Sequence, residues 1–127
     1  MTHAGLTAGY QIAQIAHAVA EYAHHAQQDF ALWRTHSERI IALQTPSMVS
    51  LEELLHAAHQ SGLTAIKFRE PDINNSLTAV AFIPDARNKP FLKGLALAGT
   101  NTRTVDKHAT LPARASNKTI TKENSQP

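Results

Sequence analysis

The chain has 127 residues, 43% of them hydrophobic, and contains no cysteine. This length suits one domain of ordinary size, and the apolar share is enough for a real core. The absence of cysteine excludes disulfides, thiolate metal ligands and cysteine nucleophiles. No apolar run approaches the ~20 residues of a membrane span, and the first residues lack a signal-peptide pattern. We therefore expect an intracellular, cytoplasmic protein with no membrane partner.

The net charge of +2 is unevenly distributed. Residues 1–100 hold 7 Lys or Arg and 8 Asp or Glu, whereas residues 101–127 hold 5 and 2. The second segment is rich in Thr, Asn, Lys and Ser and has no apolar periodicity, so we predict a disordered basic tail after a domain of residues 1–100. Such a tail is either simply solvated or adds salt-sensitive attraction to phosphates.

A helix is predicted over residues 9–28, with a short helical turn at 29–33. Polar residues recur along it at spacings of three and four, which places them on one line of the helix: Gln11, Gln14, His17, Glu21, His24 and Gln28. The other positions are mostly apolar, so we expect a largely buried helix whose polar line faces water or a ligand. A solvated face is the ordinary interpretation, but such a face is usually built of Lys and Glu. Glutamine and histidine weaken that interpretation.

Strands are predicted at residues 39–44, 64–69 and 77–83, where apolar runs are bounded by turn or polar residues. Pro84 ends the last strand, and residues 70–76 form a turn-rich loop. Because strands alternate with helices, the sequence predicts an α/β fold: a three-layer sandwich with a small mixed β-sheet flanked by helices.

A further helix is expected between the first two strands. Ser50 would cap it, Glu53 would complete a capping box, and Gly62 would stop it. A short last helix is predicted over residues 89–98. The buried face of the middle helix would comprise Leu51, Leu54, Leu55 and Ala58.

Two histidines of the middle helix, His56 and His59, stand three apart and could hold a metal ion. No third histidine or carboxylate stands at motif spacing, so we predict no metal site and no cofactor. The motifs GxGxxG, GxxxxGK[ST] and GxSxG are also absent.

Two segments resemble a known family. Residues 9–18 read GYQIAQIAHA, and residues 62–85 read GLTAIKFREPDINNSLTAVAFIPD. They resemble the second type of peptidyl-tRNA hydrolase, a small α/β enzyme of archaea and eukaryotes with shorter bacterial and viral relatives. Within residues 5–98, four positions match the family's glycine and its Q-x-x-H-A signature: Gly9, Gln14, His17 and Ala18.

The resemblance implies hydrolysis of the ester that joins a peptide or blocked amino acid to tRNA, with tRNA as the partner and a homodimer left open. Glu70 stands where the family has an aspartate, and Thr78 where it has a threonine. In this interpretation His17 takes or relays a proton, Glu70 or Asp72 orients it or acts as the base, and Thr78 with Asn75 donates to the oxyanion.

Substrate contacts are expected at the start of the first helix and in the loop before the last strand. Gly9 would let exposed backbone N–H groups approach a phosphate. The full expected set is Gly9, Tyr10, Gln14, Asn74 and Asn75.

Three departures from the family pattern leave alternatives open. Tyr10 replaces the family's lysine, and the loop between Glu70 and Thr78 is several residues shorter. Residues 1–8 are too short and polar for the family's first strand, so we expect a fold that lacks it unless the chain begins late or a partner supplies it. The alternatives are a catalytically degenerate tRNA- or protein-binding module and, third, an unrelated structural domain.

Each catalytic candidate also has a purely structural interpretation. His17 could be bonded to Glu21 within the helix, and Glu70 could only cap the loop. Thr78 is a favoured strand residue in any case.

Overall fold

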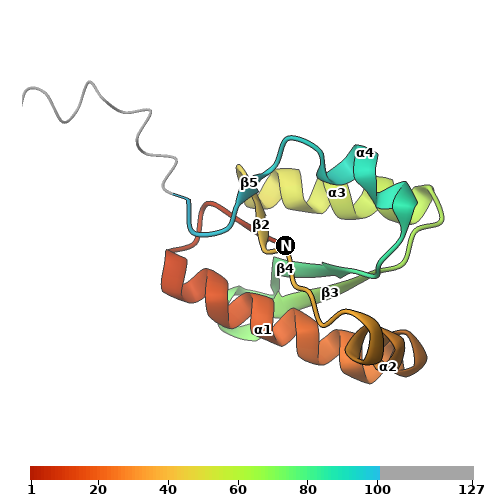
Figure 1. Cartoon of the computed structure of the whole chain (residues 1–127). Helices are drawn as coiled ribbons and strands as arrows, with labels where there is room; N and C mark the ends of the chain where they lie inside the picture. The colour runs from red at the N-terminus through yellow and green to blue at the C-terminus, as the bar shows by residue number, and fades with distance from the viewer. Residues whose placement is uncertain (101–127) are drawn as a thin grey trace, which may run out of the picture.

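The computed structural model describes residues 1–100, and the predicted tail of residues 101–127 lies outside them. Figure 1 shows three layers, with helices on both sides of the strands, and this arrangement is the one that the sequence predicts. The first layer holds α1 (Ala8–His25) and α2 (Gln27–His36), and the third holds α3 (Met48–Gln60) and α4 (Lys89–Leu92).

The middle layer consists of two ladders. One has the order β1-β2-β5, with β1 parallel to β2 and β5 antiparallel to it, and the other pairs β3 with β4 antiparallel. Reciprocal backbone hydrogen bonds between Met1 and Val80, each 2.8 Å, join β1 to β4. The strands are β1 (Thr2–His3), β2 (Leu43–Thr45), β3 (Ala65–Glu70), β4 (Ser76–Phe82) and β5 (Ala96–Leu97).

The expectation that residues 1–8 supply no first strand is wrong. Thr2 and His3 pair with β2, and Met1, Thr2 and His3 are all buried. Polarity was the misleading signal, because the Thr2 hydroxyl donates to the backbone oxygen of Thr78 at 2.7 Å. A polar side chain with a bonded partner can occupy a buried strand at little cost.

The single helix predicted over residues 9–28 is two helices. α1 stops at Ala26, whose φ of −133° leaves the helical region, and the predicted turn at 29–33 is part of α2. Aromatic rings fix the angle between the two helices: Tyr22 meets Phe30 edge-on at 5.4 Å, and Trp33 lies 6.4 Å from Tyr22.

The strand predicted at residues 39–44 begins only at Leu43. Ile40 and Ile41 are 58% and 64% exposed and precede the strand as a loop. The apolar run therefore marks a surface segment as well as a strand.

The capping of α3 differs from the prediction. Its N-cap is Ser47, and the capping box is closed by Ser50, three residues later, instead of Glu53. Gly62, at a φ of +74°, does end the helix region as expected. Leu54 is half-buried, whereas Leu51, Leu55 and Ala58 are buried.

The last helix predicted over residues 89–98 stops at Leu92. Gly94, at a φ of +82°, turns the chain back, and β5 follows. The strands at 64–69 and 77–83 lie within one residue of their predicted bounds.

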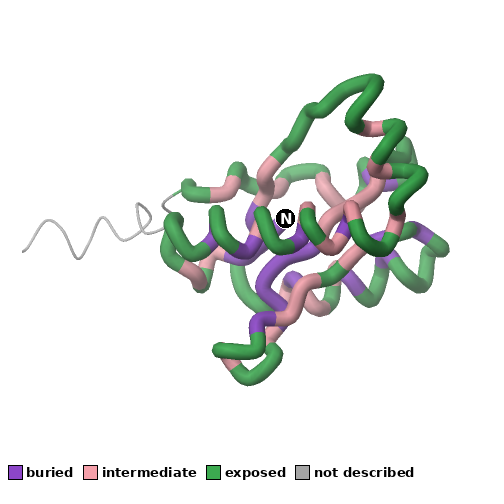
Figure 2. The backbone as a smooth tube through the Cα atoms, turned by 90° about the horizontal axis from the view of Figure 1, so that it is seen from below, coloured by how far each residue is buried: buried purple, intermediate pink, exposed green. Residues whose placement is uncertain are grey.

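The apolar core lies between α3 and the strands. Figure 2 shows buried backbone through the middle of the molecule and exposed backbone on the outer helix turns. The main cluster is formed by Met1, Leu51, Leu55, Ala65, Leu77 and Val80. α1 packs over the other face of β3 and β4, and that contact builds the candidate site.

Candidate active site

The polar line of α1 faces the sheet at its beginning, so the expectation that it faces water or a ligand throughout is wrong. Gln11 and Gln14 are each 2% exposed, whereas Ile12 between them is 71% exposed. A buried amide is tolerated when both its oxygen and its nitrogen find partners. Here the strands provide those partners.

Gln14 joins Glu70 to Thr78. Its Nε2 donates to Glu70 Oε2 at 2.9 Å, and its Oε1 accepts from the Thr78 hydroxyl at 2.6 Å. The three residues come from α1, the end of β3 and β4. The structure therefore brings together three of the predicted site residues from distant parts of the chain.

The Glu70 carboxylate is held from two sides. Besides the Gln14 bond, the backbone N–H of Asp72 donates to Oε1 at 3.3 Å. The Gln14 bond, the Asp72 N–H and the charge of His17 together outweigh desolvation and hold the pKa of Glu70 below its ordinary value. Glu70 is thus an ionised acceptor at neutral pH.

His17 lies one helical turn after Gln14 and is exposed. Its ring stacks on Phe68 with centroids 4.5 Å apart and an interplanar angle of 14°. Glu21, which the structural interpretation paired with His17, bonds His25 instead at 2.8 Å. The stacking fixes the plane of the imidazole and leaves its edge open to solvent.

Thr78 lies behind Gln14 and is only 1% exposed. Its hydroxyl donates to Gln14 and is 3.5 Å from the backbone oxygen of Phe68. Because the proton is directed at Gln14, this hydroxyl orients the amide that holds Glu70.

The loop after β3 is compact. Pro71–Ile73 forms a 3-10 turn, and Asn74 and Asn75 follow in the left-handed region, at φ values of 52° and 56°. Asparagine tolerates this region better than most residues. Asp72, Asn74 and Asn75 follow Glu70 in this loop and are all exposed.

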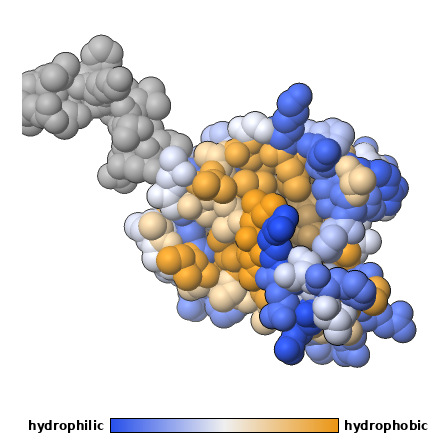
Figure 3. All heavy atoms as spheres, viewed as in Figure 1, coloured by the Kyte–Doolittle hydropathy of each residue, from blue (hydrophilic) through white to orange (hydrophobic). Residues whose placement is uncertain are grey.

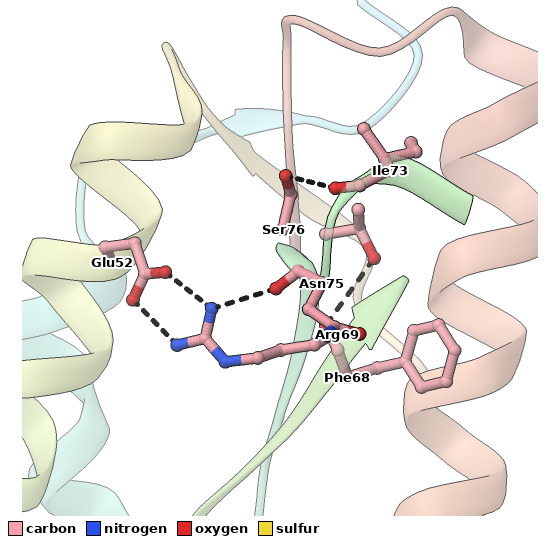
Figure 4. A network of polar contacts seen from close by, with 7 residues as sticks. Glu52, Phe68, Arg69, Ile73, Asn75 and Ser76 are labelled. Atoms are coloured by element: carbon pink, nitrogen blue, oxygen red, sulfur yellow. Dashed lines mark hydrogen bonds and ion pairs between the residues drawn. The ribbon is translucent and has the colours of Figure 1, made fainter. Parts of the chain in front are cut away.

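Figure 4 shows that neighbouring residues of β3 point to opposite sides of the sheet: Phe68 toward α1 and Arg69 toward α3. Arg69 forms a two-point pair with Glu52, at 2.8 Å and 3.1 Å, and also donates to the backbone oxygen of Asn75 at 3.4 Å. The hydrogen bond from Arg69 lowers the pKa of Glu52. Arg69 therefore braces the loop from the side opposite to His17.

Gly9 and Tyr10 lie in the first turn of α1. The helix is capped by Thr7, whose hydroxyl accepts from the backbone N–H of Tyr10 at 3.4 Å. A Cβ at Gly9 would meet nothing within 4 Å, so packing does not require glycine there. Tyr10 is 39% exposed.

Sequence reasoning missed a second polar cluster beside the first. Gln11 Nε2 donates to the backbone oxygen of His3 at 2.9 Å and to Gln44 Oε1 at 3.0 Å, and its Oε1 accepts from the N–H of Gly99 at 2.8 Å. The spacing of Gln11 and Gln14 on one helix face was the available signal. Nothing in the sequence signalled the Phe68 stack.

Among residues 1–100, no group of three His, Asp or Glu side chains is placed to hold a metal ion. His59, one of the two histidines considered as ligands, instead contacts the backbone oxygen of Ala65 at 3.1 Å. No helix in that part of the chain is long and apolar enough to cross a membrane.

A model of the family described as Peptidyl-tRNA hydrolase PTH2 matches residues 2–96. No curated protein matches the chain. The matched range begins in β1 and contains Gln14, His17, Glu70 and Thr78.

Proposed function

Because the chain belongs to the peptidyl-tRNA hydrolase PTH2 family, we propose that it hydrolyses the ester bond of peptidyl-tRNA or N-blocked aminoacyl-tRNA and releases free tRNA. The observation that carries this proposal is the ionised Glu70 carboxylate, fixed by Gln14 and by the Asp72 N–H beside an exposed, stacked His17.

The reaction needs a group that removes a proton from water as the water attacks the ester carbonyl. His17 takes this proton in our proposal, because its ring edge is open to solvent while its plane is fixed on Phe68. The negative charge of Glu70 then stabilises the imidazolium that forms. Asp72, exposed at the start of the loop, is the second carboxylate that could accept or relay the proton.

The tetrahedral oxyanion needs a donor that is free to point at it. The Thr78 proton is directed at Gln14, so we assign Thr78 a positioning role. The exposed side-chain amides of Asn74 and Asn75 are the donors that we assign to the oxyanion and to the substrate. This division changes the role that the resemblance suggested for Thr78.

Recognition of the tRNA end is assigned to the beginning of α1. Free N–H groups in the first turn of a helix attract phosphate oxygens. The open space around Gly9 leaves the backbone accessible, and Tyr10 offers an aromatic face on which a base of the acceptor end could stack.

The test is hydrolysis of an N-acetylated aminoacyl-tRNA by the full chain. We expect His17→Ala and Glu70→Gln each to lower the rate by about 10²-fold or more, the scale of a lost acid–base group. His24→Ala is the matched control, since His24 is exposed on the same helix outside the cluster. Equal losses in His17→Ala and His24→Ala would refute the assigned roles.

A non-catalytic tRNA-binding module is the second candidate, and one observation favours it: Tyr10 stands where the family has its lysine. A folded wild-type chain that binds tRNA without hydrolysing the ester would support this candidate against the first.

A further inference from the structure

An open pocket of about 440 Å³, which we call the edge pocket, lies along β3. Residues 65–69 line it together with Glu21 and His25 of α1 and His59 of α3. It shares no lining residue with an apolar groove of about 1120 Å³ on the other flank of α1, where Figure 3 shows apolar side chains gathered on the surface. The edge pocket is therefore a separate feature of the molecule.

The backbone of β3 is unpaired at this edge. β4 lies on one side of β3, and the order of the strands within residues 1–100 places none on the other side. Successive residues of a strand direct their N–H and C=O groups to opposite edges. The oxygen of Thr64 accepts from the N–H of Ile83, next to β4, whereas the oxygen of Ala65 turns away to His59 Nε2 at 3.1 Å. Lys67, two residues further on, therefore directs its own N–H and C=O outward, and no other part of the range 1–100 bonds them.

The edge pocket continues from the candidate active site. Phe68 belongs to both, because its ring stacks on His17 and it also lines the pocket. α1 runs in the direction opposite to β3, since Gln14 in its first half bonds Glu70 at the end of β3. Later turns of α1 therefore reach earlier residues of β3, where the pocket lies.

Three parts of the proposed reaction thus follow one another along α1. Its first turn is assigned to the tRNA end, His17 lies in the middle, and Glu21 and His25 border the edge pocket. The substrate has the same order, because the scissile ester lies between the tRNA and the peptide. With the tRNA on one side of the ester, the peptide leaves the reacting centre on the side of the edge pocket.

The pocket offers little that would select a peptide side chain. Its carboxylate, Glu21, is bonded to His25 at 2.8 Å, and Arg69 is bonded to Glu52. Lys67 is exposed and has no ion pair within residues 1–100, so a test must separate its charge from its backbone. Every peptide carries backbone N–H and C=O groups, so a free strand edge binds peptides of unrelated sequence.

We propose that the edge pocket binds the peptide part of peptidyl-tRNA as a strand added beside β3, an inference that rests on the proposed function. Because the last carbonyl of the peptide must reach Glu70, at the end of β3, the peptide runs parallel to β3. The Lys67 N–H donates to one peptide carbonyl, and its oxygen accepts from another peptide N–H. From His17 to His25 the helix rises by about 12 Å, the length of about three to four extended residues.

The test measures affinity of the full chain for tRNA whose 3′ ester is replaced by an amide, so that binding is read without hydrolysis. One analogue carries N-acetyl-alanine, and the other carries N-acetyl-tetra-alanine. We expect the tetra-alanine analogue to bind at least about tenfold more tightly, because two backbone hydrogen bonds are added. Equal affinities would overturn the proposal.

Two substitutions separate the backbone of Lys67 from its charge. Lys67→Pro removes the outward N–H, which β4 does not use, and proline is tolerated at such edge positions. We expect it to reduce the tenfold difference to less than about twofold. Lys67→Ala keeps the backbone groups and should keep the difference, with any change in affinity falling on both analogues alike. Equal loss of the difference in the two variants would assign the effect to the ammonium group and overturn the proposal.

Changes in the peptide give the same test on the unaltered protein. Methylation of one backbone nitrogen at a time removes a single donor from the tetra-alanine analogue. Methylation of the nitrogen that donates to the Lys67 oxygen should remove most of the added affinity, whereas methylation of a nitrogen that points to solvent should not. If no position mattered, the proposal would be wrong even where circular dichroism showed Lys67→Pro to be unfolded.

The proposal and the proposed function fail separately. Tighter binding of the tetra-alanine analogue by a chain that does not hydrolyse the ester would contradict the function alone. Hydrolysis with equal affinities for the two analogues would contradict the edge pocket alone, and binding of neither analogue would overturn the proposal as well. A wild-type dimer that Lys67→Pro dissociates would show that two copies of this chain pair at β3 instead.

Discussion

The two flanks of α1 differ in whether their buried polar atoms have hydrogen-bond partners. On the flank that faces Glu70, both amide atoms of Gln14 are bonded, and so is the carboxylate that they hold. On the opposite flank, which lines an apolar groove together with Phe82 and Leu92, Tyr22 Oη has no partner within residues 1–100. A satisfied network fixes side chains in one geometry, which suits catalysis, whereas a buried hydroxyl without a partner lowers stability.

The largest expected effect comes from Gln14→Ala. The change frees Glu70 from its main donor and leaves the buried Thr78 hydroxyl with only its 3.5 Å contact to the backbone oxygen of Phe68. We expect hydrolysis to fall by about 10²-fold, and the loss of a partner for Thr78 to lower the free energy of unfolding by about 1–3 kcal/mol. Rate assays and urea unfolding of the same preparation measure both.

Gln11→Ala is the comparison for that variant. It leaves Gln44 Oε1 and the Gly99 N–H without a bond, so stability should also fall by about 1–3 kcal/mol. Activity of the folded variant should be retained, because Gln11 does not touch Glu70. If both variants lost activity equally, the glutamines would act through stability alone.

The free energy of unfolding should depend on pH through the ionisation of the Glu70 carboxyl. The pKa of its carboxyl is lower in the folded chain than its ordinary value, so ionisation stabilises the fold above the unfolded pKa of about 4.3. That stabilisation is lost as the pH falls through the lower, folded pKa. The urea midpoint of the wild type should therefore approach that of Glu70→Gln between pH 6 and pH 3.

A difference between the two midpoints that stays constant over this range would contradict the pKa shift.

Arg69→Ala should have a small effect. Its partner Glu52 and the guanidinium are 38% and 37% exposed, and partly exposed pairs contribute about 0.2–1 kcal/mol. We expect at most a small loss of hydrolysis, because Arg69 points toward α3 (Figure 4) and reaches the loop only through its 3.4 Å bond to the backbone oxygen of Asn75. A large drop in tRNA affinity would instead assign Arg69 to phosphate recognition.

Much of the fold could be predicted from local signals. Apolar runs located β3 and β4, and Gly62 marked the end of α3. The error at residues 39–44 arose because an apolar run does not show which neighbour covers it. Ile40 and Ile41 read as a buried strand, but they lie exposed beside the groove, and β2 starts after them.

The identity of the candidate site residues could be predicted from the sequence, but their arrangement in space could not. Gln14, Glu70 and Thr78 were candidates because of the family resemblance, and the structure joins them by hydrogen bonds. Their order, with Gln14 in the middle and Thr78 behind it, depends on how α1 crosses β3 and β4. Polar residues along one line of a helix do not show whether hydrogen-bond partners lie on the strands that the helix packs against.

The smallest expected effect is that of Tyr22→Phe, and it tests the groove side of the comparison. Burial, together with the negative charge of Asp29, raises the pKa of the Tyr22 phenol, which is therefore a neutral hydroxyl with no partner in the described chain. Removing it should leave the free energy of unfolding unchanged or raise it by up to about 1 kcal/mol. Tyr10→Phe, at a 39% exposed tyrosine, is the control and should stay within about 0.5 kcal/mol. A loss of more than about 1 kcal/mol in Tyr22→Phe would mean that the hydroxyl is already hydrogen-bonded in the free protein. In that case the two flanks of α1 would be alike.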